Sequence, residues 1–401
     1  EILSGLVGSE MCIRDSTYMM DAARSMTAGA VDLGEKPSVV SAIVKYHVTE
    51  RARQVVNDGM DVIGGKGICL GPSNFLGRAY QQIPIGITVE GANILTRSLI
   101  IFGQGAIRCH PYVLAEMQAA QSPDRKQGLH DFDRAFWGHV GFVTRNKLRA
   151  LGTSLTGGRW VGVNADVAPE MKRYYQLLSR YSAAFALLAD TSMLVLGGSL
   201  KRRERLSARL GDILSQMYLV SATLKRFEDE GRQASDAPLA HWSIQDALFR
   251  LQDAFEGVLE NYPNRLVAWS LRRIVFPWGH AQSLPSDQLG QDVAQLLINP
   301  GAARDRLTAG CHLPATADEP VGAIELALAA TLEAEPIESK IRAFEKSGAL
   351  EGNPQANVRD LADAAFAAGG ITAEEYAVVK RRNTCLLYTS DVADDLLCVD
   401  L

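Results

Sequence analysis

Hydrophobic residues recur at helical spacing along almost the whole chain, which lacks the alternating pattern of strands. The clearest case begins at Pro37, where apolar residues return every three or four positions as far as Ile63 and charged residues take the other face. Proline suits a first helical turn, and Gly64 with Gly65 ends the segment. The pattern predicts an all-α fold of amphipathic helices.

Pro, Gly and Asn clusters divide the chain into further predicted helices. Ser243 is a candidate N-cap, and Thr372-Ala373-Glu374-Glu375 has the form of a capping box. The predicted helices cover residues 18–32, 37–63, 112–120, 131–151, 169–196, 201–227, 243–259, 264–275, 287–298, 321–335, 337–346, 358–368 and 372–381.

One carboxylate stands apart, because Glu90 lies between a short apolar run and an apolar helical pattern. Pro84 and Gly86 disfavour helix, so the segment from Ile83 to Val89 is expected to be irregular. The helical pattern after it places Glu90 near a helix N-terminus. Gly91 leaves space beside the carboxylate, which suits a general base if the apolar neighbours bury it. A solvated carboxylate that complements the helix dipole is the open alternative.

The residues around Glu90 also carry a family resemblance. Val89-Glu90-Gly91-Ala92, preceded by Ile63-Gly64-Gly65-Lys66-Gly67 and Arg78, resembles the C-terminal helical domain of acyl-CoA dehydrogenases. Residues 88–111, TVEGANILTRSLIIFGQGAIRCHP, are similar to bacterial long-chain members with an extended C-terminal region. The resemblance implies an all-α C-terminal bundle over residues 17–110, then a helical extension over residues 111–383.

The resemblance implies FAD-dependent α,β-dehydrogenation of a medium- or long-chain fatty acyl-CoA to trans-2-enoyl-CoA, the first step of fatty acid β-oxidation. Glu90 would remove the α-proton, and its backbone N–H would stabilise the enolate oxygen together with a flavin ribityl hydroxyl. Gly64, Gly65 and Gly91 would contact the cofactor, although Gly64 and Gly65 are equally explained as a helix end. The implied partners are an electron-transfer flavoprotein and further copies of the chain.

Two positions depart from the family pattern. Asp61 stands where members commonly have Gln, and Ala92 stands where they have a hydroxyl residue after Glu-Gly. Flavin contacts through these side chains are therefore not expected. Arg78, Arg97 and Arg108 flank the Glu90 region and could pair with CoA or flavin phosphates, or serve as ordinary helix charges.

Composition and charge exclude several classes of function. The formal net charge is −5, and no basic block is interleaved with aromatic residues, so nucleic acid is not an expected partner. No apolar run reaches the roughly 18 residues of a membrane-spanning helix, so no segment is expected to cross a membrane. Lys201-Arg202-Arg203-Glu204-Arg205 could contact anionic lipid or form a solvated turn. A cytoplasmic protein is expected, and peripheral attachment to the inner membrane is the open alternative.

Cysteine and histidine spacing predicts no metal site. The cysteines at positions 69, 109 and 311 are widely separated, and no two histidines share a helix face at ligand spacing. These histidines are His110, His130, His139, His241, His280 and His312.

Both ends of the chain read like translated sequencing adaptor. Met11-Cys12-Ile13-Arg14-Asp15-Ser16 back-translates to ATGTGTATAAGAGACAG, which resembles the mosaic end of transposon adaptors, and Cys385-Leu386-Leu387-Tyr388-Thr389-Ser390 back-translates to its reverse complement. We therefore expect residues 1–16 and 384–401 to be artefact. The family's β-domain and N-terminal helical domain have no counterpart in the chain, so by itself it is expected to be inactive.

Two other functional classes stay open at this point. A helical module for dimerisation or membrane association would need no chemistry of its own, and residues after Pro111 show no recognisable site. An acyl-CoA oxidase would share the proton chemistry but pass its electrons to oxygen, so peroxide production distinguishes it from a dehydrogenase.

Removal of the two ends tests the adaptor hypothesis. Because adaptor-encoded residues have no evolved packing partners, deleting residues 1–16 and 384–401 should leave the melting temperature nearly unchanged. Differential scanning calorimetry of the trimmed and full chains makes the comparison. A loss of several degrees would show that one of the ends packs.

Overall fold

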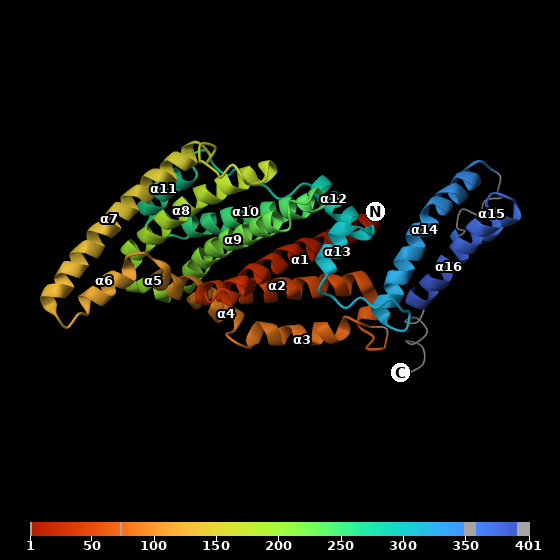
Figure 1. Cartoon of the computed structure of the whole chain (residues 1–401), viewed down its shortest axis with the longest axis horizontal. Helices are drawn as coiled ribbons and strands as arrows, with labels where there is room; N and C mark the ends of the chain where they lie inside the picture. The colour runs from red at the N-terminus through yellow and green to blue at the C-terminus, as the bar shows by residue number, and fades with distance from the viewer. Residues whose placement is uncertain (1, 73, 349–357, 391–401) are drawn as a thin grey trace. The chain divides into compact units, whose positions relative to one another are not determined.

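A computed structural model describes residues 2–72, 74–348 and 358–390, with side chains described for residues 16–72, 74–106, 109–348 and 361–385 (Figure 1). Every regular element in these ranges is a helix, which confirms the all-α prediction. The elements are α1 (Ile2–Asp32), α2 (Ser38–Ile63), η1 (Gly64–Gly67), α3 (Gly77–Thr88), α4 (Asn93–Leu95), η2 (Thr96–Gln104), α5 (Gly105–Cys109), α6 (Val113–Ala120), α7 (Arg125–Leu155), η3 (Pro169–Met171), α8 (Lys172–Leu196), η4 (Gly197–Arg202), α9 (Glu204–Asp229), η5 (Ala234–Asp236), α10 (Ala237–Glu260), α11 (Arg265–Val275), α12 (Asp287–Ile298), α13 (Ala302–Thr308), α14 (Pro320–Lys346), α15 (Val358–Ala367) and α16 (Ala373–Ser390).

Two of the predicted helix ends are confirmed by their backbone geometry. α2 stops at Ile63, and Gly64 follows with φ +67°, the left-handed conformation that favours glycine. The capping box before α16 is formed in both directions. The Thr372 N–H donates to Glu375 Oε2 (2.8 Å), and the Glu375 N–H donates to Thr372 Oγ1 (3.2 Å).

The prediction of an irregular segment from Ile83 to Val89 is wrong, because helix α3 continues to Thr88. Pro84 lies in its interior, but proline removes only one backbone donor and is exposed here, so water can reach the carbonyl left without its partner. Gly86 faces α2, where a Cβ atom would make an ordinary contact with the Thr49 methyl group at 3.6 Å. Packing thus outweighs the two local breakers.

Three other predicted boundaries are also wrong. α10 begins at Ala237, so Ser243 is a buried interior residue rather than an N-cap. α7 begins at Arg125, after Asp124, whose side chain accepts from two backbone N–H groups of the first turn. α14 runs unbroken through the exposed Pro336, because buried apolar residues on both sides of the proline hold the helix in its core.

The chain divides into two compact units, and the first comprises residues 1–58 and 82–298. Helix α9 is its central element and packs against α1, α8, α10 and η2. Residues before and after Pro111 therefore pack together in this unit instead of forming separate bundles. Many α9 side chains are fully buried, including Leu210, Ile213 and Phe227. Their burial makes α9 the core of the unit.

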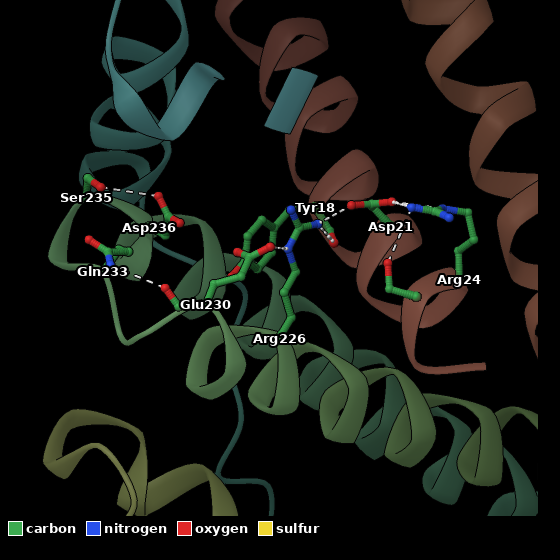
Figure 2. A network of polar contacts seen from close by, with 9 residues as sticks. Tyr18, Asp21, Arg24, Arg226, Glu230, Gln233, Ser235 and Asp236 are labelled. Atoms are coloured by element: carbon green, nitrogen blue, oxygen red, sulfur yellow. Dashed lines mark hydrogen bonds and ion pairs between the residues drawn. The ribbon is translucent and has the colours of Figure 1, made fainter. Parts of the chain in front are cut away.

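A buried arginine joins α9 to α1 (Figure 2). The Arg226 side chain is only 7% exposed, and it pairs with Asp21 (2.9 Å) and Glu230 (3.0 Å). It also donates to the Tyr18 carbonyl oxygen (3.2 Å), and its guanidinium lies 4.4 Å from the Tyr18 ring centroid. Two carboxylates and an aromatic face thus compensate the buried charge.

The second unit comprises residues 59–81 and 299–401. Within its described part, α14 packs against α15 and α16. The small core between these helices contains alanines, which allow close approach, and a few larger aliphatic residues. Its buried members are Ala334, Ile341, Leu361, Ala362, Ala365, Ile371 and Val379.

One continuous helical stretch, Pro169–Arg202, is long and apolar enough by composition to span a membrane, contrary to the expectation from the sequence. A bent pair, residues 77–88 with 93–104, passes the same test only if taken as one segment. The core helices of soluble proteins also pass, and α8 behaves like one. It carries the buried Arg180 and Asp190, and many of its apolar residues pack inside the first unit.

Ser16 of α1 lies in a packed environment. Ser16 is 5% exposed and accepts a hydrogen bond from Arg51 (3.4 Å), although it is the last residue of the expected N-terminal artefact. A deletion that preserves this contact should therefore keep Ser16.

Candidate active site

Glu90 occupies a tight turn between α3 and α4 and has φ +54°, one of two positive φ values among the described non-glycine residues. Gly91 follows with φ +91°, and Ala92 is the N-cap of α4. The expectation that Glu90 precedes a helix N-terminus is confirmed. A left-handed glutamate costs free energy, so the contacts around the turn must hold it.

Helix α2 supplies those contacts. Lys45 Nζ donates to the Gly91 carbonyl oxygen (2.7 Å) and to Asn93 Oδ1 (2.6 Å). Asn93 is 2% exposed, and its Nδ2 donates to Thr49 Oγ1 and to Glu50 Oε1, both at 2.9 Å. Thr96 Oγ1 donates to the same Gly91 oxygen (3.1 Å). We call Lys45, Thr49, Glu50 and Asn93 the turn clamp.

Glu90 itself is exposed, so within this chain the apolar neighbours do not bury its carboxylate and the solvated alternative describes its surroundings. Its neighbours in sequence are exposed as well. Val89 is 47% exposed and Ile94 78% exposed, although both are apolar. Exposed apolar residues around an exposed carboxylate mark a surface suited to cover by a ligand or by further protein.

The helix after the turn is unusual. Residues Thr96–Gln104 form a π-helix, in which the Gly105 N–H reaches back to the Ile100 carbonyl oxygen. π-Helical segments of this kind are rare and occur mainly near functional sites. Ile101 and Phe102 on this helix are buried in the core of the first unit. The turn of Glu90 therefore leads directly into a packed element.

Gly64 and Gly65 are exposed, and a Cβ atom at either would meet nothing within 4 Å. A ligand can therefore approach their backbone. Gly91 is more enclosed, since a Cβ there would lie 3.4 Å from Thr96 Oγ1. Glu90 and Gly91 belong to the first compact unit, whereas Gly64 and Gly65 belong to the second.

The three flanking arginines differ in their surroundings. Arg97 forms a two-point pair with Asp212 of α9, with distances of 2.9 and 2.6 Å, and this hydrogen bonding raises the pKa of Arg97. That pair anchors η2 to α9, so Arg97 has a structural role. Arg78 is exposed, and the side chain of Arg108 lies outside the described residues.

A polar cleft of about 800 Å³ lies in the first unit, between α2, η2, α9 and α10. His47 lines it and is 8% exposed. Burial, followed by the positive charges of the nearby Arg51, Arg97 and Arg250, lowers the pKa of His47 to about 3. His47 is therefore neutral at physiological pH. Because charged side chains dominate the lining, the cleft does not suit an apolar acyl chain.

Two family models match the chain. Residues 107–392 match "Acyl-CoA dehydrogenase, C-terminal, bacterial type", and residues 15–102 match "Acyl-CoA dehydrogenase, C-terminal domain". The chain belongs to the acyl-CoA dehydrogenase family. The two matched segments meet between residues 102 and 107, a few residues before the boundary at position 110 expected from the sequence.

A solved structure shares the fold of this acyl-CoA dehydrogenase chain. It is an acyl-CoA dehydrogenase complexed with FAD from Bacillus anthracis, with a TM-score of 0.51 and 16% sequence identity. The similarity covers 73% of this chain and 48% of the other, so the chain spans about half the length of that protein. The helical fold and the C-terminal position expected from the resemblance are confirmed.

Sequence reasoning did not find the turn clamp. Asn93 lay inside the quoted motif, but only the structure shows that its side chain is turned inward. The relevant signal on α2 was the spacing of Lys45 and Thr49, which places both on one helix face.

Removal of the Asn93 amide should loosen the Glu90 turn. In Asn93→Ala, Lys45 and Glu50 each lose a partner, and leaving such groups unpaired costs about 1–3 kcal/mol. Amide hydrogen exchange of a peptide covering residues 86–96 should become faster. Asn57→Ala, at an exposed position on α2, is the control and should leave exchange of this peptide unchanged. Equal protection in both variants would contradict the role of the clamp.

Proposed function

We propose that this chain supplies the base-carrying C-terminal part of an enzyme that dehydrogenates fatty acyl-CoA thioesters to trans-2-enoyl-CoA. One observation carries the proposal. Glu90 stands in the acyl-CoA dehydrogenase motif and is held in a left-handed conformation by the turn clamp. Strain retained on a rigid support is typical of a residue whose placement matters for chemistry.

Glu90 would act as the general base. Its carboxylate takes the proton from the thioester α-carbon, and the negative charge develops on the thioester carbonyl oxygen. The backbone N–H of Glu90 is the donor proposed for that oxygen. Because Val89 and Ile94 are exposed beside the carboxylate, an acyl chain lying on them would exclude water from the base.

The backbone at Gly64 and Gly65 fits the pyrophosphate of an FAD cofactor. Gly64 and Gly65 offer exposed backbone with open space where side chains would otherwise stand, as close approach of a pyrophosphate requires. A bound FAD supplies the two-electron acceptor for the β-hydride. Gly91 is proposed to keep the space next to Glu90 open, because any side chain there would be strained at φ +91°.

The proposed substrate chain length, electron acceptor and oligomeric state rest on the resemblance to the family. We propose medium- or long-chain substrates, an electron-transfer flavoprotein as acceptor and a homo-oligomeric enzyme. The acyl-CoA oxidase alternative is tested by peroxide formation in air during turnover. A purely structural module is the other alternative, and it predicts that substitution of Glu90 has no effect on turnover.

Glu90→Gln is the central test, made in the complete enzyme with the domains that the resemblance implies upstream. Loss of a positioned base should lower turnover by at least about 10²- to 10⁴-fold, because glutamine cannot accept the α-proton. The visible flavin spectrum should be unchanged, since the substitution preserves shape. Dye reduction with a long-chain acyl-CoA measures turnover. Glu35→Gln, also exposed, is the control and should remain active; activity retained by Glu90→Gln would rule out its role.

We also propose a peripheral contact with anionic membrane through the exposed basic residues at positions 201, 202, 203 and 205. The argument is their proximity in sequence to exposed apolar residues at the end of α8, Leu194 and Val195. Such a contact would locate a cytoplasmic enzyme at the inner membrane.

Charge reversal tests the membrane contact. Each basic residue near an anionic surface contributes about 1 kcal/mol, so the double substitution Arg202→Glu and Arg203→Glu should weaken vesicle binding by well over about tenfold. Sedimentation with phosphatidylglycerol vesicles gives the affinity. Lys36→Glu with Lys126→Glu changes the net charge equally at other exposed sites and should bind nearly as the parent does. An equal loss of vesicle affinity in both double variants would contradict a specific membrane contact through positions 201–205.

A further inference from the structure

A compact group of four ionisable side chains lies away from Glu90, where α5, α6, α7 and α8 meet. His110 follows α5, Glu116 is on α6, His139 on α7 and Asp190 on α8. His110 Nε2 lies 2.9 Å from Asp190 Oδ1, and His139 Nε2 lies 3.8 Å from the same oxygen. The donor atoms of His110, His139 and Asp190 all lie within 4.8 Å of one another.

The hydrogen bonds of His139 define its protonation. Its Nδ1 lies 2.8 Å from Glu116 Oε1, a carboxylate that can only accept, so Nδ1 carries the proton. In the neutral ring, Nε2 then presents a lone pair toward Asp190. A carboxylate that fixes one ring nitrogen while the other faces a site is the usual arrangement of a metal-binding histidine.

Asp190 provides an independent sign of a missing partner. The residue is 6% exposed, and its Oδ2 has no hydrogen-bond partner among the described residues. An unpaired buried carboxylate oxygen is costly, and a cation would compensate it. The 3.8 Å between His139 Nε2 and Asp190 Oδ1 is too long for a hydrogen bond. It is close to the roughly 3.4 Å between two ligands of a tetrahedral Zn²⁺ ion with bonds near 2.0–2.1 Å.

We propose that His110, His139 and Asp190 bind a divalent transition-metal ion of the zinc type, with Glu116 as the residue that orients His139. Imidazole and carboxylate donors suit such ions, and three protein ligands leave one position for water. Phe142 packs edge-on against His110, with ring centroids 5.5 Å apart, and Tyr112 stacks on His139 at 5.9 Å. These rings partly enclose the site and limit access of water.

Binding changes the hydrogen bonding of His110. Without metal, its Nδ1 accepts from the backbone N–H groups of Tyr112 (3.2 Å) and Val113 (3.1 Å), so its proton is on Nε2 and directed at Asp190. Coordination through Nε2 moves that proton to Nδ1 and ends both long amide contacts. Amide exchange at the start of α6 should therefore change when the ion binds.

The proposed ion would have a structural role. Its three ligands come from the residue after α5, the middle of α7 and the end half of α8, so binding would cross-link these segments. His110 also lies just after the point where the two family segments meet. The ion would thus fasten the segment that follows α5 to α7 and α8.

Zinc titration of the purified full chain, freed of metal with a chelator, tests the proposal. Competition with a chromophoric chelator should show about one Zn²⁺ bound per chain with a Kd on the order of micromolar or tighter. The melting temperature should rise with added Zn²⁺. His139→Gln should lower the affinity by at least about 100-fold and abolish the rise. Glu116→Gln should lower it by roughly 10- to 100-fold, as expected for a residue that orients a ligand.

His130→Gln is the matched control, because His130 lies on the same helix α7 and is exposed. This variant should bind Zn²⁺ as the parent does. Circular dichroism of His139→Gln without metal should match the parent, and Asp190→Asn provides a second, isosteric loss of a ligand. Absence of stoichiometric binding, or equal weakening by His130→Gln and His139→Gln, would overturn the proposal.

Discussion

The buried charge of Arg226 constrains the whole first unit. A guanidinium removed from water is tolerated only with its partners in place, and these come from α1 as well as from α9. The beginning of the family domain is therefore fixed to a helix of the extension. This pairing and the packing of α9 against α1 and η2 join the two family segments within one compact unit.

The position of Glu90 follows from the same packing. α2 rests on the core through Val39 and Ile43, which meet Ile101 of η2, with Leu214 and Tyr218 of α9 packed alongside. The hydrogen bonds of the turn clamp then fix the Glu90 turn relative to α2. A long-range path of contacts thus leads from the interior of the extension to a carboxylate on the surface.

Much of the helical architecture could be predicted from periodicity, and the motif around Glu90 identified the family. The errors have physical causes. Pro84 and Pro336 are exposed within helices, where each removes one backbone donor while packing retains the rest of the helix. Contacts between distant segments, such as Asn93 with Glu50 and His110 with Asp190, have no local signal. The histidines appeared scattered because their grouping depends on how four helices meet.

The left-handed backbone of Glu90 limits which residues evolution can place there. Glycine, asparagine and aspartate adopt this conformation most readily, but the first two have no carboxylate and aspartate is one methylene shorter. β-Branched residues are disfavoured by the backbone alone. Two restrictions therefore act on position 90. The backbone conformation favours glycine, asparagine or aspartate, whereas the proposed proton transfer requires the longer carboxylate of glutamate. A glutamate can persist there only while the clamp residues of α2 are retained, so those positions should diverge slowly together with it.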